Sequence, residues 1–188
     1  MPSLRLFFAL ETPQNIRADM ARVQNDLRSL GADVRWESAE KFHATLKFLG
    51  DTDSRLLPEI VLTIEGVLAG FRAPVVRYQG LGCFPGPRDP RVIWIGMTDT
   101  GNTLVPLQEA LELALVPLGF ARESRDFHPH ITLGRVKGRR GIKSLIDRME
   151  SAIFESQPVS IPDVVLMRSE LKPAGSVYTP LRVFPLNR

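Results

Sequence analysis

The stretch HPHITLGR, residues 128–135, holds two of the three histidines in a chain of 188 residues. The third histidine lies in HATLKFLG, residues 43–50, so that His-x-Thr-Leu occurs twice, at His43 and again 87 residues later at His130. In a β-strand, residues two apart point to the same face, so each phrase directs one imidazole and one hydroxyl to one surface and its aliphatic residues to the core. The repeat predicts that two His–Thr pairs share one site.

Two His–Thr pairs that face one another suit acid–base chemistry on a phosphate. An imidazole with a pKa of about 6.5 accepts or donates a proton at neutral pH, so one ring serves as base toward water and the other as acid toward a leaving oxygen. The threonine hydroxyls donate hydrogen bonds to the non-bridging oxygens and stabilise the charge that builds there. A cyclic phosphodiester fits such a site, because a strained ring opens without a metal.

His128 leaves two alternatives open. It has the same strand parity as His130, so the two, with His43 as a third ligand, would make a three-histidine zinc site. The other alternative is that the histidines are unrelated, half-buried side chains. Pro129 stiffens the segment, and neither an Asp-rich stretch nor a second cysteine completes a metal site. Because His43 aligns with His130, we expect His128 at the start of the strand or on its rim.

Apolar periodicity predicts strands interspersed with helices. Strands are predicted at 4–11, 34–37, 42–50, 75–84, 91–97, 130–136, 159–171 and 177–186, and helices at 13–30, 54–68, 104–118 and 143–153. Thr12 is the expected N-cap of the first helix, with Pro13 at its first position. The fold class is therefore α+β, with antiparallel sheets and helices on their outer faces.

The composition is that of a globular protein, with 44% hydrophobic and 24% charged residues. Apolar runs are too short to cross a bilayer, and the N-terminus is a poor signal peptide. Cys83 is the only cysteine, which excludes an intramolecular disulfide and makes a reducing cytoplasm the expected location.

The charge permits a polyanionic partner. The formal net charge is +3 with a pI of about 9.3, and 19 arginines stand against 5 lysines. Arginine suits phosphate and stacks on bases. The segment RVKGRRGIK, residues 135–143, carries five basic residues and no acid. It is either a solvated loop or a segment that binds RNA phosphates beyond the reacting group.

The two phrases resemble the paired HxTx signatures of the two-histidine phosphoesterase superfamily. RLFFAL (5–10), PRVIWIGM (90–97) and SELKPAGSVYTPL (169–181) are similar to segments of the RNA 2′,3′-cyclic phosphodiesterase family, historically called 2′-5′ RNA ligase. The resemblance covers nearly the whole chain. It implies that residues 1–188 form a single two-lobed domain, in which two antiparallel sheets face a central cleft, each lobe presents one motif and the halves form a pseudo-twofold repeat.

The resemblance also implies the reaction and its residues. A ribose 2′,3′-cyclic phosphate, at an RNA end or in a cyclic nucleotide, is hydrolysed to a 2′-phosphate without metal or cofactor. His43 is the implied general acid to the departing O3′, and His130 the general base on water. Thr45 and Thr132 are the implied phosphate-binding residues.

Phe48 and Arg135 are implied as clamps on the nucleobase, by stacking and cation–π contact. Strict alternation along the strands puts both on the face opposite the His–Thr pairs. They reach the cleft only if the strand ends before them or bends at Gly134.

Other interpretations of the same motifs remain. The site also suits the reverse reaction, 2′-5′ ligation of RNA, or hydrolysis of 2′-5′ oligonucleotides or small cyclic nucleotides. A different class is an RNA- or nucleotide-binding module without turnover. We expect a monomer without membrane contact, core positions for Trp36 and Trp94, and structural roles for Ser169 and Tyr178.

Overall fold

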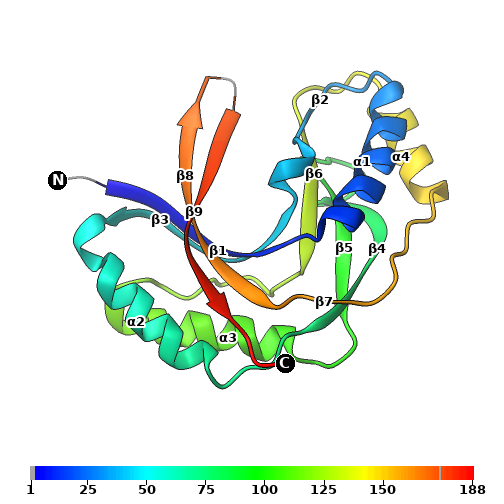
Figure 1. The fold of residues 1–188 in the computed structure, drawn as a ribbon. Helices are drawn as coiled ribbons and strands as arrows, with labels where there is room; N and C mark the ends of the chain where they lie inside the picture. Colours follow the sequence, from blue (N-terminus) through cyan, green and yellow to red (C-terminus); the bar gives the residue numbers. More distant parts are fainter. Residues whose placement is uncertain (1–2, 174) are drawn as a thin grey trace.

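The chain forms one antiparallel sheet with helices on its outer side, in a computed structural model that describes residues 3–173 and 175–188 (Figure 1). The sheet order is β7-β4-β5-β6-β3-β1-β8-β9, and β2 pairs with β6. The strands are β1 (Ser3–Glu11), β2 (Val34–Trp36), β3 (His43–Asp53), β4 (Val75–Phe84), β5 (Val92–Asp99), β6 (His130–Val136), β7 (Val159–Ser160), β8 (Asp163–Lys172) and β9 (Gly175–Pro185). The helices are α1 (Gln14–Ser29), α2 (Leu57–Leu68), α3 (Leu104–Leu115) and α4 (Ile142–Ser151).

The predicted α+β class is confirmed, with one difference in the sheet. Two sheets were expected to face each other, whereas the strands join into a single curled sheet. The two halves of this sheet, β1-β3-β8-β9 and β2-β4-β5-β6-β7, are joined where β3 and β6 pair at Ala44 and Ile131. The junction lies within the two His-x-Thr motifs.

Two helices, α1 and α3, cross from one half of the sheet to the other: each packs on the half to which the strand before it does not belong. α1 follows β1 in the chain but packs beside α4 and β2 on the other half. α3 follows β5 but packs beside α2 and β3. Each half of the sheet is therefore covered on its outer side by one helix from each half of the sequence, and the two halves of the sequence are interleaved.

The core forms from the apolar stripes of the helices and the convex face of the sheet. On α1 the buried residues Ile16, Met20, Gln24 and Leu27 recur at helical spacing. Thr12 does not cap this helix, because Pro13 occupies the cap position and the buried Thr12 makes no side-chain cap bond. In the part of the chain that the structure describes, no helix has the length and apolar character needed to span a membrane.

The strand β1 is buried on both faces. Leu6, Phe8 and Leu10 face the main core. Phe7 and Ala9 face the other side, where they form a small cluster with two side chains of β8 and with Tyr178. This second cluster supports the concave face of the sheet, on which the candidate site lies.

Candidate active site

The antiparallel register at the junction brings the two motifs together. Ala44 lies opposite Ile131, so continuing the register by one residue in each direction sets His43 against Thr132 and Thr45 against His130. The aliphatic partners are buried, at 1% and 0% exposure. The imidazoles and hydroxyls therefore point to the concave face.

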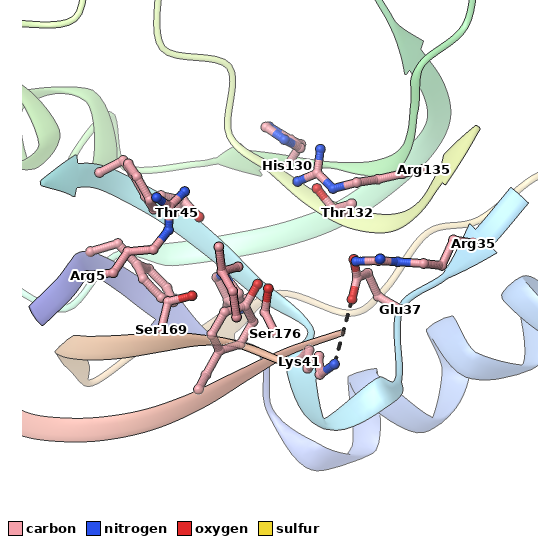
Figure 2. A pocket seen from close by; sticks show the side chains of 15 residues that line it. Arg5, Arg35, Glu37, Lys41, Thr45, His130, Thr132, Arg135, Ser169 and Ser176 are labelled. Atoms are coloured by element: carbon pink, nitrogen blue, oxygen red, sulfur yellow. Dashed lines mark ion pairs between the residues drawn. The ribbon is translucent and has the colours of Figure 1, made fainter. Parts of the chain in front are cut away.

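A cavity of about 420 Å³ lies at this point. All six side chains that the sequence and the resemblance predict for the site line it (Figure 2), together with nine others. The full lining is Arg5, Phe7, Arg35, Glu37, Lys41, His43, Thr45, Phe48, His130, Thr132, Arg135, Ser169, Leu171, Ser176 and Tyr178.

A β-bulge in β3 returns Phe48 to the cavity. Lys47 and Thr45 pair with two consecutive residues of β1, which leaves Leu46 as an extra residue. Leu46 and Lys47 are both buried, so the alternation shifts by one and Phe48 lies on the same face as Thr45. The expectation from strict alternation, which placed Phe48 on the opposite face, is wrong for this reason.

The strand β6 carries the equivalent bulge. Thr132 and Gly134 pair with two consecutive residues of β5, and Leu133 is the extra residue. Arg135 consequently lines the cavity. A Cβ on Gly134 would lie 2.7 Å from a methyl carbon of Val34, so only glycine fits at this position. The two bulges occupy the same place in the two motifs, 87 residues apart.

A buried glutamine holds the bulge carbonyl in each half. Gln24 of α1 donates from Nε2 to the carbonyl of Leu133 at 2.8 Å and to that of Glu37 at 2.7 Å. Gln108 of α3 donates to the carbonyl of Leu46 at 3.4 Å. A bulge takes a carbonyl out of the regular ladder, and a buried acceptor requires a donor. The crossing helices supply it.

His43 is enclosed by aromatic rings. Its centroid lies 5.0 Å from that of Phe7 and 5.2 Å from that of Tyr178. Burial lowers the pKa of His43 from 6.5 to about 4; the backbone of Lys41 opposes this, and the positive charges of Arg17 and His130 add to it. His43 is therefore neutral at neutral pH in the free protein.

His130 has a similar environment. Phe84 meets it edge-on at 5.0 Å between centroids, and burial lowers the pKa of His130 below 6.5. Its Nδ1 lies 2.6 Å from the carbonyl of His128. Because a carbonyl only accepts, Nδ1 donates and Nε2 keeps its lone pair. This contact fixes the ring of His130 and its tautomer.

Positive charge surrounds the cavity. Arg5, Arg35, Lys41 and Arg135 line it, against a single acid, Glu37, in the described lining. Glu37 lies 4.0 Å from Lys41, the ion pair drawn in Figure 2. Three guanidinium groups remain around the His–Thr pairs, and guanidinium groups suit phosphate oxygens.

One of these guanidinium groups also covers Phe48. The Arg5 Cζ lies 4.5 Å above the centre of the Phe48 ring, and Phe48 is 46% exposed. A large aromatic ring that stays this exposed, with a cation on one face, is suited to stack a planar ligand.

One wall of the cavity is formed by the β8–β9 hairpin and was not predicted from the sequence. Ser169 and Tyr178, expected to be structural, form part of the cavity with Leu171 and Ser176. Figure 2 shows Ser169 and Ser176 below Thr45, His130 and Thr132, which with His43 form the tetrad. Their alternate spacing along two strands was the available signal, because Ser169 pairs with Tyr178 and Leu171 with Ser176.

His128 lies outside this cavity, exposed before the start of β6. Within residues 3–173 and 175–188, no group of three or more His, Cys, Asp or Glu side chains is arranged to hold a metal ion. The described residues therefore do not form the alternative zinc site of His43, His128 and His130. Trp36 packs against the main core as expected, and Trp94 lies beside His130, with 6.4 Å between ring centroids.

Comparison with known proteins places the whole chain in one family. The family model described as "LigT like Phosphoesterase" matches residues 10–94 and 95–178, and each stretch holds one His-x-Thr motif. The RNA 2′,3′-cyclic phosphodiesterase of Methanothermobacter thermautotrophicus is 38% identical over 186 residues, with 97% of this chain and 99% of the relative covered. Among solved structures, TT0787 of Thermus thermophilus has a TM-score of 0.80 at 28% identity over 97% of this chain and 98% of that one.

The fold of E. coli LigT complexed with 3′-AMP is also similar, with a TM-score of 0.79 at 24% identity and full coverage of both chains. The resemblance that the two motifs indicated is thus confirmed, and the chain belongs to the LigT-like phosphoesterase family.

Proposed function

We propose that this phosphoesterase hydrolyses the 2′,3′-cyclic phosphate at the end of an RNA to a 2′-phosphate. The single observation that carries the proposal is the convergence of two His–Thr pairs on one cationic cavity. The relative in Methanothermobacter thermautotrophicus is an RNA 2′,3′-cyclic phosphodiesterase by name, and E. coli LigT was solved with 3′-AMP. Both names agree with a terminal nucleotide as ligand.

In the proposed mechanism, His130 is the general base and His43 the general acid. Nδ1 of His130 donates to a carbonyl, which leaves Nε2 to take a proton from water. The water oxygen forms a bond to phosphorus, the bond from phosphorus to O3′ breaks, and His43 gives its proton to O3′. Thr45 and Thr132 donate hydrogen bonds to the non-bridging oxygens as charge builds on them.

The acid must be protonated, although the pKa of His43 is about 4 in the free protein. An anionic phosphate beside the ring favours the imidazolium form and raises the pKa of His43 in the complex. Substrate binding therefore brings the acid into its working protonation state.

Phe48 and Arg135 are the proposed contacts to the nucleobase. The bulges direct both toward the cavity that the tetrad lines. The exposed ring of Phe48 offers a face for stacking and Arg135 a planar cation. All of these groups come from one chain, which supports a monomer, and Cys83 favours a reducing compartment such as the cytoplasm.

The test is incubation with RNA that ends in a 2′,3′-cyclic phosphate, with and without EDTA. We expect a 2′-phosphate product and the same rate in both samples. A protein that only binds would saturate with the cyclic nucleotide and leave it unchanged. Turnover that is lost in EDTA and restored by zinc would contradict the metal-independent mechanism.

A further inference from the structure

A second cavity adjoins the catalytic one. It has a volume of about 610 Å³ and shares Thr45, Phe48 and His130 with the first. Its lining includes the rings of Phe84 and Phe127. Aromatic faces of this kind stack on nucleobases with little regard to sequence. A planar group that follows directly after the ligand in the catalytic cavity can therefore stack in the second one.

The outer wall of this second cavity is held in place by a buried ion pair. Nζ of Lys47 lies 2.6 Å from a carboxylate oxygen of Glu112, with the two side chains 6% and 5% exposed, and also donates to the carbonyl of Ala121 at 2.6 Å. The same carboxylate accepts the backbone N–H of Glu123 at 3.1 Å. These bonds fix the loop that carries Phe127. The cavity is thus formed before any ligand arrives, which lowers the entropic cost of binding.

A third cavity, of about 670 Å³, continues from the second through Arg91, which lines both. It lies between the β4–β5 turn, the basic segment 135–143 and α4. Its acidic side chains are Asp89 and Asp147. Its basic side chains are Arg88, Arg91, Lys137, Arg139 and Lys143.

Part of this positive charge is not neutralised. Arg91 lies 3.2 Å from Asp89, and Lys143 lies 2.7 Å from Asp147. Within residues 3–173 and 175–188, the remaining three basic side chains of this cavity form no ion pair. Cations without a partner are available to bind phosphates.

We propose that the RNA strand upstream of the cyclic phosphate follows this series of cavities. The penultimate base stacks in the second cavity, against Phe127. The phosphate on the 5′ side of the penultimate nucleotide binds Lys137 and Arg139 in the third cavity. The inference rests on the proposed function, because it takes the terminal cyclic phosphate to lie between the two histidines. Continuity with the catalytic cavity, ring faces and unpaired cations together match single-stranded RNA.

The experiment compares a series of substrates of increasing length. A nucleoside 2′,3′-cyclic phosphate is compared with the same nucleotide extended on its 5′ side by one, two and three nucleotides. We expect kcat/KM to rise on the order of tenfold with the first added nucleotide, from base stacking. A further rise with the second should depend on salt, and the third should add nothing.

Two sets of variants separate the steps. Phe127→Ala should remove the first increment, measured as the ratio of kcat/KM between the extended and the mononucleotide substrates. Lys137→Ala with Arg139→Ala should remove the second and make the salt dependence shallower by about 0.7 for each phosphate that is no longer bound. The control is Arg72→Ala, an exposed arginine that lines none of the three cavities.

The outcomes are distinct. Equal kcat/KM for all substrate lengths, or increments that persist in the variants, would overturn the proposed path of the RNA strand and leave the proposed function intact. Hydrolysis of neither the mononucleotide nor the extended substrates would remove the proposed function and this inference with it. Increments lost equally in Arg72→Ala would show a general charge effect and also overturn it.

Discussion

Ala44 of β3 lies opposite Ile131 of β6, and this pairing joins the two halves of the sheet. Both side chains are buried, which turns the neighbouring imidazoles and hydroxyls outward. The spacing of the candidate acid and base therefore depends on a backbone contact inside the motifs themselves, and the sheet alone brings the two rings together.

Replacing either histidine of the tetrad should abolish most turnover. We expect His43→Ala and His130→Ala each to lower kcat by roughly 10²- to 10⁴-fold, the usual contribution of an acid or base. Initial rates on a 2′,3′-cyclic nucleotide measure this, with thermal unfolding to show that the variants stay folded. His128→Ala is the control and should retain its rate. Full activity in either tetrad variant would remove that residue from the mechanism.

The rate should be highest on the acid side of the ordinary histidine range. Burial lowers the pKa of His43 from 6.5 to about 4 and also lowers that of His130. Since the profile of kcat/KM reports the free protein, both of its limbs should lie below pH 6.5. The profile of kcat should lie at higher pH, because bound phosphate stabilises the imidazolium. An optimum of kcat/KM above about pH 7 would contradict this assignment.

The free energy of unfolding should fall as the pH falls from about 6.5 to about 4. In this window the unfolded chain protonates His43 and the folded protein does not, so protons favour unfolding. Urea unfolding at a series of pH values measures the slope. The slope gives the difference in bound protons between the unfolded and folded states, and in His43→Asn this difference should decrease by about one. Parallel slopes in the variant and the native chain would show that His43 does not titrate in this way.

Breaking the buried ion pair should destabilise the protein strongly. Lys47→Met leaves the carboxylate of Glu112 buried without its cation and should cost about 3–5 kcal/mol in the free energy of unfolding. The double variant Lys47→Met with Glu112→Met should recover most of this loss, since no uncompensated charge remains. Urea unfolding of both variants is the measurement. An equal loss in the single and double variants would mean that packing, and not charge, dominates at this pair.

Removing the donor beneath the β6 bulge should affect binding more than chemistry. Gln24→Leu leaves the carbonyls of Leu133 and Glu37 without this amide and should cost about 1–3 kcal/mol of stability. Because the bulge carries Arg135 into the cavity, KM should rise more than kcat falls. Gln14→Leu, on the exposed start of the same helix, is the control.

A double-variant cycle decides whether Gln24 acts through the bulge. If Gln24→Leu only repositions Arg135, its effect on KM should largely disappear in an Arg135→Ala background. Additive effects would indicate that the glutamine stabilises the fold without positioning this side chain.

The sequence predicted the fold class and the outward direction of the tetrad because both follow from regular periodicity. A period of two places His43 and Thr45 on one face whatever surrounds the strand. The face of Phe48 and Arg135 could not be predicted in this way, because one extra residue in each strand reverses the alternation. Bulges depend on the pairing partner, which a single strand does not reveal.

Other features depend on tertiary packing. Lys47 and Glu112 are 65 residues apart and each resembles a surface charge in the sequence, yet they form a buried pair. The crossing of α1 and α3 between the halves of the sheet has no local signal either.

The repeat of the motif bears on the regiochemistry of the reaction. Two alike His–Thr pairs, one in each half of the sheet, do not by themselves distinguish the two ester bonds of a five-membered ring. The positions that follow the bulges are unlike, a phenyl ring at Phe48 and a cation at Arg135, and they break this degeneracy. In the proposed mechanism, we expect the orientation of the sugar, and hence which hydroxyl is set free, to follow from these two side chains, which take no part in proton transfer.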